Sequence, residues 1–335
     1  MNLATEQTVA GLLGSALMSN SVKLGKYDVA DLYTTMNDIK QKNDDMNSWV
    51  AELSGAMNEA RIGYAIVKGQ TVAQYYPHPE VRISGDIDMY LDIEHLAKFK
   101  DVMKSRFGID VPDFGQGKHV AVEFCGTELE VHSRLTDIYR NKGSRYWADI
   151  YLEGFSSCEK TVIGGDEVSM LNPTLNVLYV FVHLFYHLLI LGVSLRQFCD
   201  WAMALHHSFV NESQKIDKEM LRHHLEELNL YDAYCAFGTV LVDVLGLNEE
   251  EFLFELTDFH RRYTKLILED IMARGNFGMY NRKSHVAGWR HSLETGKATF
   301  AHLWRYYRLA PKEMRAFLPK QIKESIRLNV NRMKR

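Results

Sequence analysis

Two aspartates, Asp86 and Asp88, stand one residue apart in the apolar stretch VRISGDIDMYLD, residues 81–92. Alternate side chains of a β-strand share a face, so a strand here places both carboxylates on one face and apolar side chains on the other. The two Cα atoms would lie about 7 Å apart, which lets the carboxylate oxygens converge on one or two divalent cations. Mg²⁺ prefers such oxygen ligands, and phosphate oxygens commonly complete its shell. The pair alone also fits a solvated strand face or a helix cap, so its surroundings must decide.

A third acid follows in the stretch TELEVHS, residues 127–133, where Glu130 and His132 share one face of a predicted strand. A turn at residues 126–127 would pair Glu123 with Glu130 across a hairpin. Like charges in that position repel each other unless a cation or a basic side chain lies between them. Glu130 is therefore the predicted third carboxylate, placed to complete a metal shell or to accept a proton from an incoming hydroxyl.

Phosphate-binding residues are predicted in the part of the chain that precedes Asp86. Lys68 and Gly69 follow the apolar run YAIV, and a lysine at a strand end beside a helix start can bind phosphate by charge and by free backbone N–H groups. Arg82 could bind phosphate through two hydrogen bonds. Gly85 has no side chain, so a ligand can approach its backbone closely.

The elements that must position these residues form a mixed α/β segment between two helical parts. Apolar spacing and turn residues predict strands at 61–69 and 82–93, helices at 70–76 and 93–108, and a hairpin over 119–135. A second hairpin is expected to turn at Gly164-Gly165, and Asn172-Pro173 should begin a helix. Helices are also predicted at 5–18 and 28–62, and throughout the chain after residue 172.

The predicted fold class is therefore α+β. We expect N-terminal helices over 1–59 that pack on the core, a core of mixed sheet and helices over 60–170, and an all-helical domain over 171–335. A chain of 335 residues is long enough for two domains of ordinary size.

Composition favours a globular cytoplasmic protein. Hydrophobic residues make up 46% of the chain and charged residues 24%. The four cysteines lie far apart without a Cys-x-x-Cys motif, which argues against the usual zinc and redox spacings and fits reduced thiols in the cytosol. The first residues lack the basic segment of a signal peptide. Residues 174–192 are apolar enough to resemble a membrane span, but their Asn and His residues favour a buried central helix and no span.

The basic C-terminal part contrasts with the net charge of −4 for the whole chain. Residues 301–335 hold ten Lys and Arg against two Glu. This tail could contact RNA, phospholipid or another anion, or it could be a solvated helix face; the sequence favours the second interpretation.

The order AIVKGQTVAQYYP, VRISGDIDMYLD and LEVHSRL resembles the uncharacterised bacterial nucleotidyltransferase family of the DNA polymerase β-like superfamily. The similarity covers residues 60–135 and extends to the helical stretches 183–205 and 275–283. The resemblance implies a polymerase β-like core in which Asp86, Asp88 and Glu130 bind metal.

The resemblance also implies a reaction. A Mg²⁺-dependent enzyme, with Mn²⁺ as a possible substitute, would transfer NMP from an NTP such as ATP to an unidentified acceptor, which could be a small molecule, a protein or RNA. Lys68, Gly69, Arg82 and Gly85 would contact the nucleotide. The alternative is a non-catalytic nucleotide- or partner-binding protein on the same fold. Because neighbouring carboxylates repel each other without a cation, we expect that replacing one aspartate by asparagine leaves the fold intact.

Other residues with chemical potential have more ordinary explanations. His183 and His187 share a helix face and could bind a metal, but their apolar surroundings favour packed core histidines. Arg196 and Asp200 could contact a nucleotide, although an ion pair within one helix is expected. The stretch GNFGMYN, residues 275–281, is either a turn between helices or a loop at the site.

Overall fold

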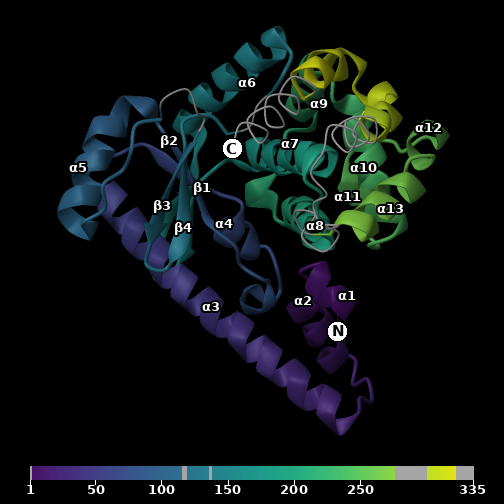
Figure 1. Ribbon diagram of the computed structural model, residues 1–335, viewed down its shortest axis with the longest axis horizontal. Helices are drawn as coiled ribbons and strands as arrows, with labels where there is room; N and C mark the ends of the chain where they lie inside the picture. Colours follow the sequence, from purple (N-terminus) through teal and green to yellow (C-terminus); the bar gives the residue numbers. More distant parts are fainter. Residues whose placement is uncertain (1, 115–118, 136–137, 276–299, 322–335) are drawn as a thin grey trace, which may run out of the picture. The chain divides into compact units, whose positions relative to one another are not determined.

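The computed structural model describes the chain except residues 1, 115–118, 136–137, 276–299 and 322–335 (Figure 1). The chain forms two compact units. The first comprises residues 1–136, 150–180 and 195–216, and the second comprises 137–149, 181–194 and 217–335. The two units interleave in sequence, while the linear division at residues 59 and 170 stays a prediction.

The first unit contains one mixed sheet. Its six strands are β1 (Tyr64–Val67), β2 (Ile87–Leu91), β3 (His119–Phe124), β4 (Thr127–His132), β5 (Glu159–Ile163) and β6 (Asp166–Met170). Their order in the sheet is β3-β4-β2-β1-β6-β5. β2 is antiparallel to β1 and parallel to β4, so the strand that carries Asp88 lies in the interior of the sheet. The predicted α+β class with a mixed sheet is confirmed.

The predicted turn of the second hairpin is confirmed. Ile163 pairs with Asp166, which leaves Gly164 and Gly165 as the two turn residues, with φ of +60° and +94°. Two-residue hairpin turns of this kind need positive φ at both positions, and glycine adopts positive φ without a steric penalty.

The predicted turn of the β3–β4 hairpin is wrong by one residue, which changes the strand pairing by two residues. Phe124 pairs with Thr127, so the turn consists of Cys125 and Gly126, and Glu123 faces Glu128. The turn residues have φ of +52° and +83°. A turn at residues 126–127 would force the β-branched Thr127 to positive φ, which is strongly disfavoured, and this explains why the turn lies at Cys125 and Gly126 instead.

The first unit also contains helices. They include α1 (Asn2–Glu6), α2 (Ala10–Ser19), α3 (Lys26–Glu59), α4 (Gly69–Ala73), α5 (Leu96–Phe107) and α8 (Leu195–Val210), with short 3₁₀ turns at Pro79–Val81 and Ile93–His95. The long α3 runs beside the sheet (Figure 1). Apolar side chains of α3 and α5 share a core with Ile87, Met89 and Leu91 of β2. This core is the apolar face that the alternation in β2 predicts.

Two helical predictions need correction. The helix expected at 5–18 is interrupted between α1 and α2, where Thr8 has φ of +52°. The sequence interpretation also missed α6 (Asn141–Gly154), which includes a glycine at position 143. By contrast, α5 ends as expected, with Gly108 at φ of +70°.

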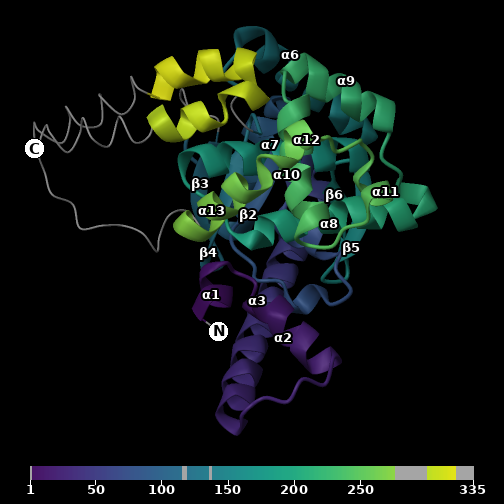
Figure 2. The same ribbon diagram turned by 90° about the vertical axis from the view of Figure 1, so that its right-hand side faces the viewer.

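The described part of the second unit contains helices and no strand (Figure 2). Its helices are the N-terminal part of α6, the C-terminal part of α7 (Pro173–Ile190), α9 (Lys218–Leu228), α10 (Tyr231–Asp243), α11 (Glu249–Phe252), α12 (Asp258–Arg261), α13 (Thr264–Arg274) and helical segments at 300–305 and 311–321. The predicted start of α7 is confirmed, because the Asn172 side chain accepts a hydrogen bond of 3.0 Å from the Leu175 N–H.

Among the described helices, α7 is the one with the length and apolar composition needed to cross a membrane, and 78% of it is buried in the structure. Such burial is typical of a core helix. Cytoplasmic location stays a prediction. Most of the stretch at 275–281 and the end of the basic tail, from residue 322, lie outside the described residues.

Candidate functional site

The three predicted acids come together on two neighbouring strands. Asp88 of β2 pairs in register with Glu130 of β4, and Asp86 lies just before β2. Carboxylate oxygens of Asp86, Asp88 and Glu130 lie within 4.8 Å of one another. Asp86 is exposed, Glu130 is half-buried and Asp88 is 3% exposed. We call these three residues the acidic cluster.

Lys68 reaches the acidic cluster from the other neighbouring strand. Val67, the last residue of β1, is opposite Asp88, and the Lys68 Nζ lies 3.0 Å from the Asp88 Oδ2. Burial alone would lower the pKa of Lys68, but the Asp88 carboxylate raises it above its usual value. Lys68 is therefore a charged partner of Asp88 at neutral pH, as well as a predicted phosphate contact.

His132 adds a further donor to the acidic cluster. Its Nε2 lies 2.9 Å from the Asp88 Oδ1 and 3.3 Å from the Glu130 Oε2. Burial lowers the pKa of His132, but the hydrogen bonds to Asp88 and Glu130 outweigh this and raise it. The sequence placed His132 on the same face as Glu130 and assigned it no role.

The two aspartates differ in their charge environment. Burial would raise the pKa of Asp88, but the Lys68 charge and the hydrogen bond from His132 lower it well below its usual range. Partial desolvation and the Asp88 charge raise the pKa of Asp86. Asp88 is therefore already compensated by protein groups, whereas Asp86 presents an exposed carboxylate that gains most from a nearby cation.

Arg82 forms its ion pair with Asp200 and not with a residue of the acidic cluster. Its Nε and Nη2 donate to the two carboxylate oxygens of Asp200 in α8, at 2.7 and 2.8 Å, and the Tyr76 hydroxyl also donates to Asp200 at 2.8 Å. Arg82 is only 2% exposed. A phosphate contact by Arg82 would require this pair to open and stays a prediction. The expected pair of Arg196 with Asp200 is corrected, because Arg82 occupies both oxygens of Asp200.

Arg196 instead supports the segment that carries Asp86. Its Nη1 donates a 2.7 Å hydrogen bond to the Ile83 carbonyl oxygen. A Cβ atom added to Gly85 would meet nothing nearer than the Arg196 Nη1, at 4.0 Å, so the backbone at Gly85 is open as predicted. On the other side, the Asn43 side chain of α3 donates to the Arg82 carbonyl oxygen at 2.7 Å. Helices α3 and α8 thus hold the segment before β2 from both sides.

Gly69 follows a backbone reversal at the end of β1. Lys68 has φ of +56° and Gly69 has φ of +44°. A Cβ atom on Gly69 would lie 3.6 Å from the Asp86 carbonyl oxygen. Gly69 therefore lies beside the acidic cluster, and the helix that follows, α4, has five residues.

His119 is a second residue that sequence interpretation overlooked. It lies on β3 directly opposite His132, and its Nε2 is 4.0 Å from the Glu130 Oε1. His119, Glu130 and His132 can also offer ligand atoms within 4.8 Å of one another. Because β3 and β4 form a hairpin, a corrected register would have predicted this pairing.

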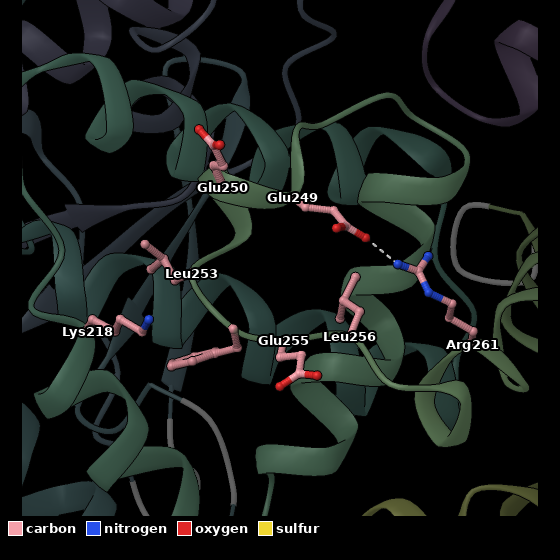
Figure 3. Close-up of a pocket in the computed structure, with 8 residues that line it drawn as sticks. Lys218, Glu249, Glu250, Leu253, Glu255, Leu256 and Arg261 are labelled. Carbon is pink, nitrogen blue, oxygen red and sulfur yellow. Dashed lines mark hydrogen bonds and ion pairs between the residues drawn. The ribbon is translucent and has the colours of Figure 1, made fainter.

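Two other features lie apart from these residues in the chain. His183 and His187 pack with ring centroids 4.0 Å apart on α7, and no third His, Cys, Asp or Glu among the described residues joins them as a metal ligand. In the second unit, a hollow of about 740 Å³ is lined by Lys218, Glu249, Glu250, Leu253, Phe254, Glu255, Leu256 and Arg261 (Figure 3). None of the predicted site residues lines it.

Comparison with known proteins places the acidic cluster in a family context. An antigenic nucleotidyltransferase-like protein from Paracoccidioides brasiliensis has a solved structure that covers 65% of this chain and 97% of its own, at 14% identity and a TM-score of 0.38. That similarity is too low to support an argument about fold or function. No curated protein matches the chain. The family model described as uncharacterised nucleotidyltransferase matches residues 1–246, a span that includes the whole sheet and the acidic cluster, and the chain therefore belongs to this family.

Proposed function

We propose that the protein is a magnesium-dependent nucleotidyltransferase that transfers NMP from an NTP to a hydroxyl or phosphate acceptor. The observation that carries the proposal is the acidic cluster, because three carboxylates from β2, β4 and the segment before β2 share one small volume. Membership of a nucleotidyltransferase family supports the reaction class.

The residues present fit a divalent cation. Oxygens that lie within 4.8 Å of one another can bind a common ion, and the exposed Asp86 leaves room for phosphate and water ligands. Asp86, Asp88 and Glu130 would hold the cation, with Mg²⁺ as the expected ion and Mn²⁺ as a substitute. When bound, the cation supplies positive charge to the phosphate oxygens and lowers the pKa of the acceptor hydroxyl.

The residues of the chain have distinct parts in the proposed reaction. An acceptor oxygen forms a bond to the α-phosphorus, the bond from that phosphorus to the β-bridging oxygen breaks, and pyrophosphate leaves. Glu130 is the carboxylate placed to take the acceptor proton, because it is half-buried at the rim of the cluster. Lys68 is placed to bind phosphate oxygens by charge, and Arg196 to keep the Asp86 segment in position.

The test measures chemistry directly. The full-length protein is incubated with each NTP, Mg²⁺ and a cell extract as the source of acceptor, and both pyrophosphate release and transfer of α-phosphate label are followed. We expect both signals with at least one NTP, and neither with the Asp86→Asn variant.

The alternative, a nucleotide- or partner-binding protein without catalysis, gives a different result. NTP binding that raises the melting temperature of the wild-type protein, with no label transfer under any condition, would support it and contradict the transferase proposal.

A further inference from the structure

The β3–β4 hairpin brings two imidazoles to one carboxylate. His119 and His132 are direct partners across the hairpin, with ring centroids 5.3 Å apart, and both face Glu130. The distances from Nε2 to the nearest Glu130 oxygen are 4.0 Å for His119 and 3.3 Å for His132. The Nδ1 atom of each ring is buried without a hydrogen-bond partner among the described residues. Nε2 is therefore the nitrogen that each ring presents to Glu130.

This arrangement has the donor set of a transition-metal site. Zinc binds to imidazole nitrogen and carboxylate oxygen at about 2.0–2.2 Å, which places two donors of a tetrahedral ion about 3.3 Å apart. The His132–Glu130 separation of 3.3 Å equals that value, and the His119–Glu130 separation of 4.0 Å, measured to the other carboxylate oxygen, is longer, so a side-chain rotation of His119 or Glu130 would let the three donors share one ion. Two histidines and one glutamate also leave a fourth position open, as in catalytic zinc sites.

The chemistry of the donors separates this group from the acidic cluster. Three carboxylates suit Mg²⁺, whereas imidazole favours zinc, iron, cobalt or nickel over magnesium. His119 contributes only to the second group, Asp86 contributes only to the first, and Glu130 belongs to both. The side chain of His119 is 37% exposed and that of Glu130 is 23% exposed, so an ion can enter from solvent.

We propose that His119, Glu130 and His132 form a binding site for a divalent transition-metal ion, Zn²⁺ or a borderline ion of similar size, next to the carboxylate site. The ion on the His132 Nε2 takes the place of the hydrogen that otherwise lies between this nitrogen and the carboxylates of Asp88 and Glu130. Glu130 is the residue that can bridge the two sites. The proposal concerns metal binding and does not depend on nucleotidyl transfer.

The test uses Co²⁺ as the probe, because its visible absorption depends on ligand type and coordination number. The full-length protein is treated with chelator, exchanged into chelator-free buffer and titrated with Co²⁺ in the presence of excess Mg²⁺, and bound Co²⁺ is then displaced with Zn²⁺. We expect one Co²⁺ site with a low-coordinate absorption spectrum and tighter binding of Zn²⁺ than of Co²⁺.

Two variants and one control locate that site. His119→Gln removes a ligand at a partly exposed position, and we expect at least about tenfold weaker Co²⁺ binding, since even outer-shell changes at metal sites cost that much. Asp86→Asn should leave Co²⁺ binding in excess Mg²⁺ unchanged. His78→Gln changes an exposed histidine beside an acid outside the site and should have no effect. His132 is less suitable as a test position because it is buried between two carboxylates.

Clear results would overturn the proposal. If His119→Gln binds Co²⁺ with unchanged affinity and spectrum, the ion does not lie at the proposed site. If Asp86→Asn loses Co²⁺ binding while His119→Gln keeps it, the ion belongs to the acidic cluster. Absence of Co²⁺ binding by the wild-type protein in excess Mg²⁺ would also refute it. None of these results changes the expected pyrophosphate release, so the two proposals can fail separately.

Discussion

Replacing Asp200 by asparagine should destabilise the first unit, because Asp200 is the counter-charge of a fully enclosed arginine. Arg82 is 2% exposed and donates to both Asp200 oxygens, at 2.7 and 2.8 Å. Asparagine has nearly the same shape but only one acceptor oxygen, and its amide group donates where Arg82 also donates. The change therefore removes at least one charge-assisted hydrogen bond and leaves the Arg82 charge uncompensated.

The expected magnitude follows from that geometry. Removing one partner of a buried ion pair costs about 3–5 kcal/mol, a large part of the 5–15 kcal/mol that is typical of folded proteins. The loss should depend on pH. Burial opposes ionisation of Asp200, but the Arg82 charge lowers its pKa below the usual range. The wild-type pair thus stabilises the fold above the unfolded-state pKa of about 3.9, and this stabilisation is lost as pH falls through the lower folded-state pKa.

Amide hydrogen exchange measured by mass spectrometry can test this prediction, because it reports α8 and β2 separately from the second unit. We expect Asp200→Asn to lower the opening free energy of both elements at pH 7, and the difference from wild type to shrink toward pH 3. Asp113→Asn is the matched control, since Asp113 pairs with Lys100 at an exposed position and should show no change. A loss below about 1 kcal/mol at pH 7 would refute the reasoning that Arg82 depends on Asp200.

Asp88→Asn should lower the free energy of unfolding of the metal-free protein by roughly 3 kcal/mol, measured by urea unfolding, because Lys68 loses its buried partner. An unchanged free energy of unfolding would instead support the expectation from sequence that replacing one aspartate leaves the fold intact. Glu130→Gln should lower turnover about 10²-fold or more, the scale expected for loss of a general base, while the affinity for NTP stays nearly constant. Glu128→Gln should lower turnover only slightly. A larger loss of turnover in Glu128→Gln than in Glu130→Gln would assign the role of third acid to Glu128. Burial and the nearby His223 charge lower the pKa of His224 to about 4. The unfolded chain therefore binds more protons between pH 6.5 and 4, and the second unit should lose about 2 kcal/mol from pH 7 to 5; an equal loss in a His224→Gln variant would contradict this assignment.

Local chemistry was enough to predict the face that carries the aspartates. Strand alternation has a period of two, so Ile87 and Met89 had to face the core if Asp88 faced away from it, and the structure buries both in the core. The turn at Gly164-Gly165 and the end of α5 at Gly108 were also readable, because these glycines adopt positive φ.

The sequence prediction failed at the β3–β4 turn, although positive φ at the β-branched Thr127 is strongly disfavoured. Gly126 could occupy either position of a two-residue turn, and the choice of Cys125 as its partner decided the register of β3–β4. That choice determined that Glu123 faces Glu128 and that His119 faces His132. Moving the turn by one residue changes the pairing by two residues, so each side chain keeps its face of the sheet but faces a different neighbour.

The sequence alone determined which residue types could bind a metal, and Asp86, Asp88 and Glu130 were named from spacing and resemblance. Only the tertiary structure decided which basic side chains lie beside these carboxylates. The strand order places β2 between β1 and β4, which brings Lys68 to one side of Asp88 and His132 to the other. Arg82 forms an ion pair with Asp200, a residue 118 positions later in the chain. Pairings over such separations depend on how strands and helices pack, and no periodicity within a segment encodes them.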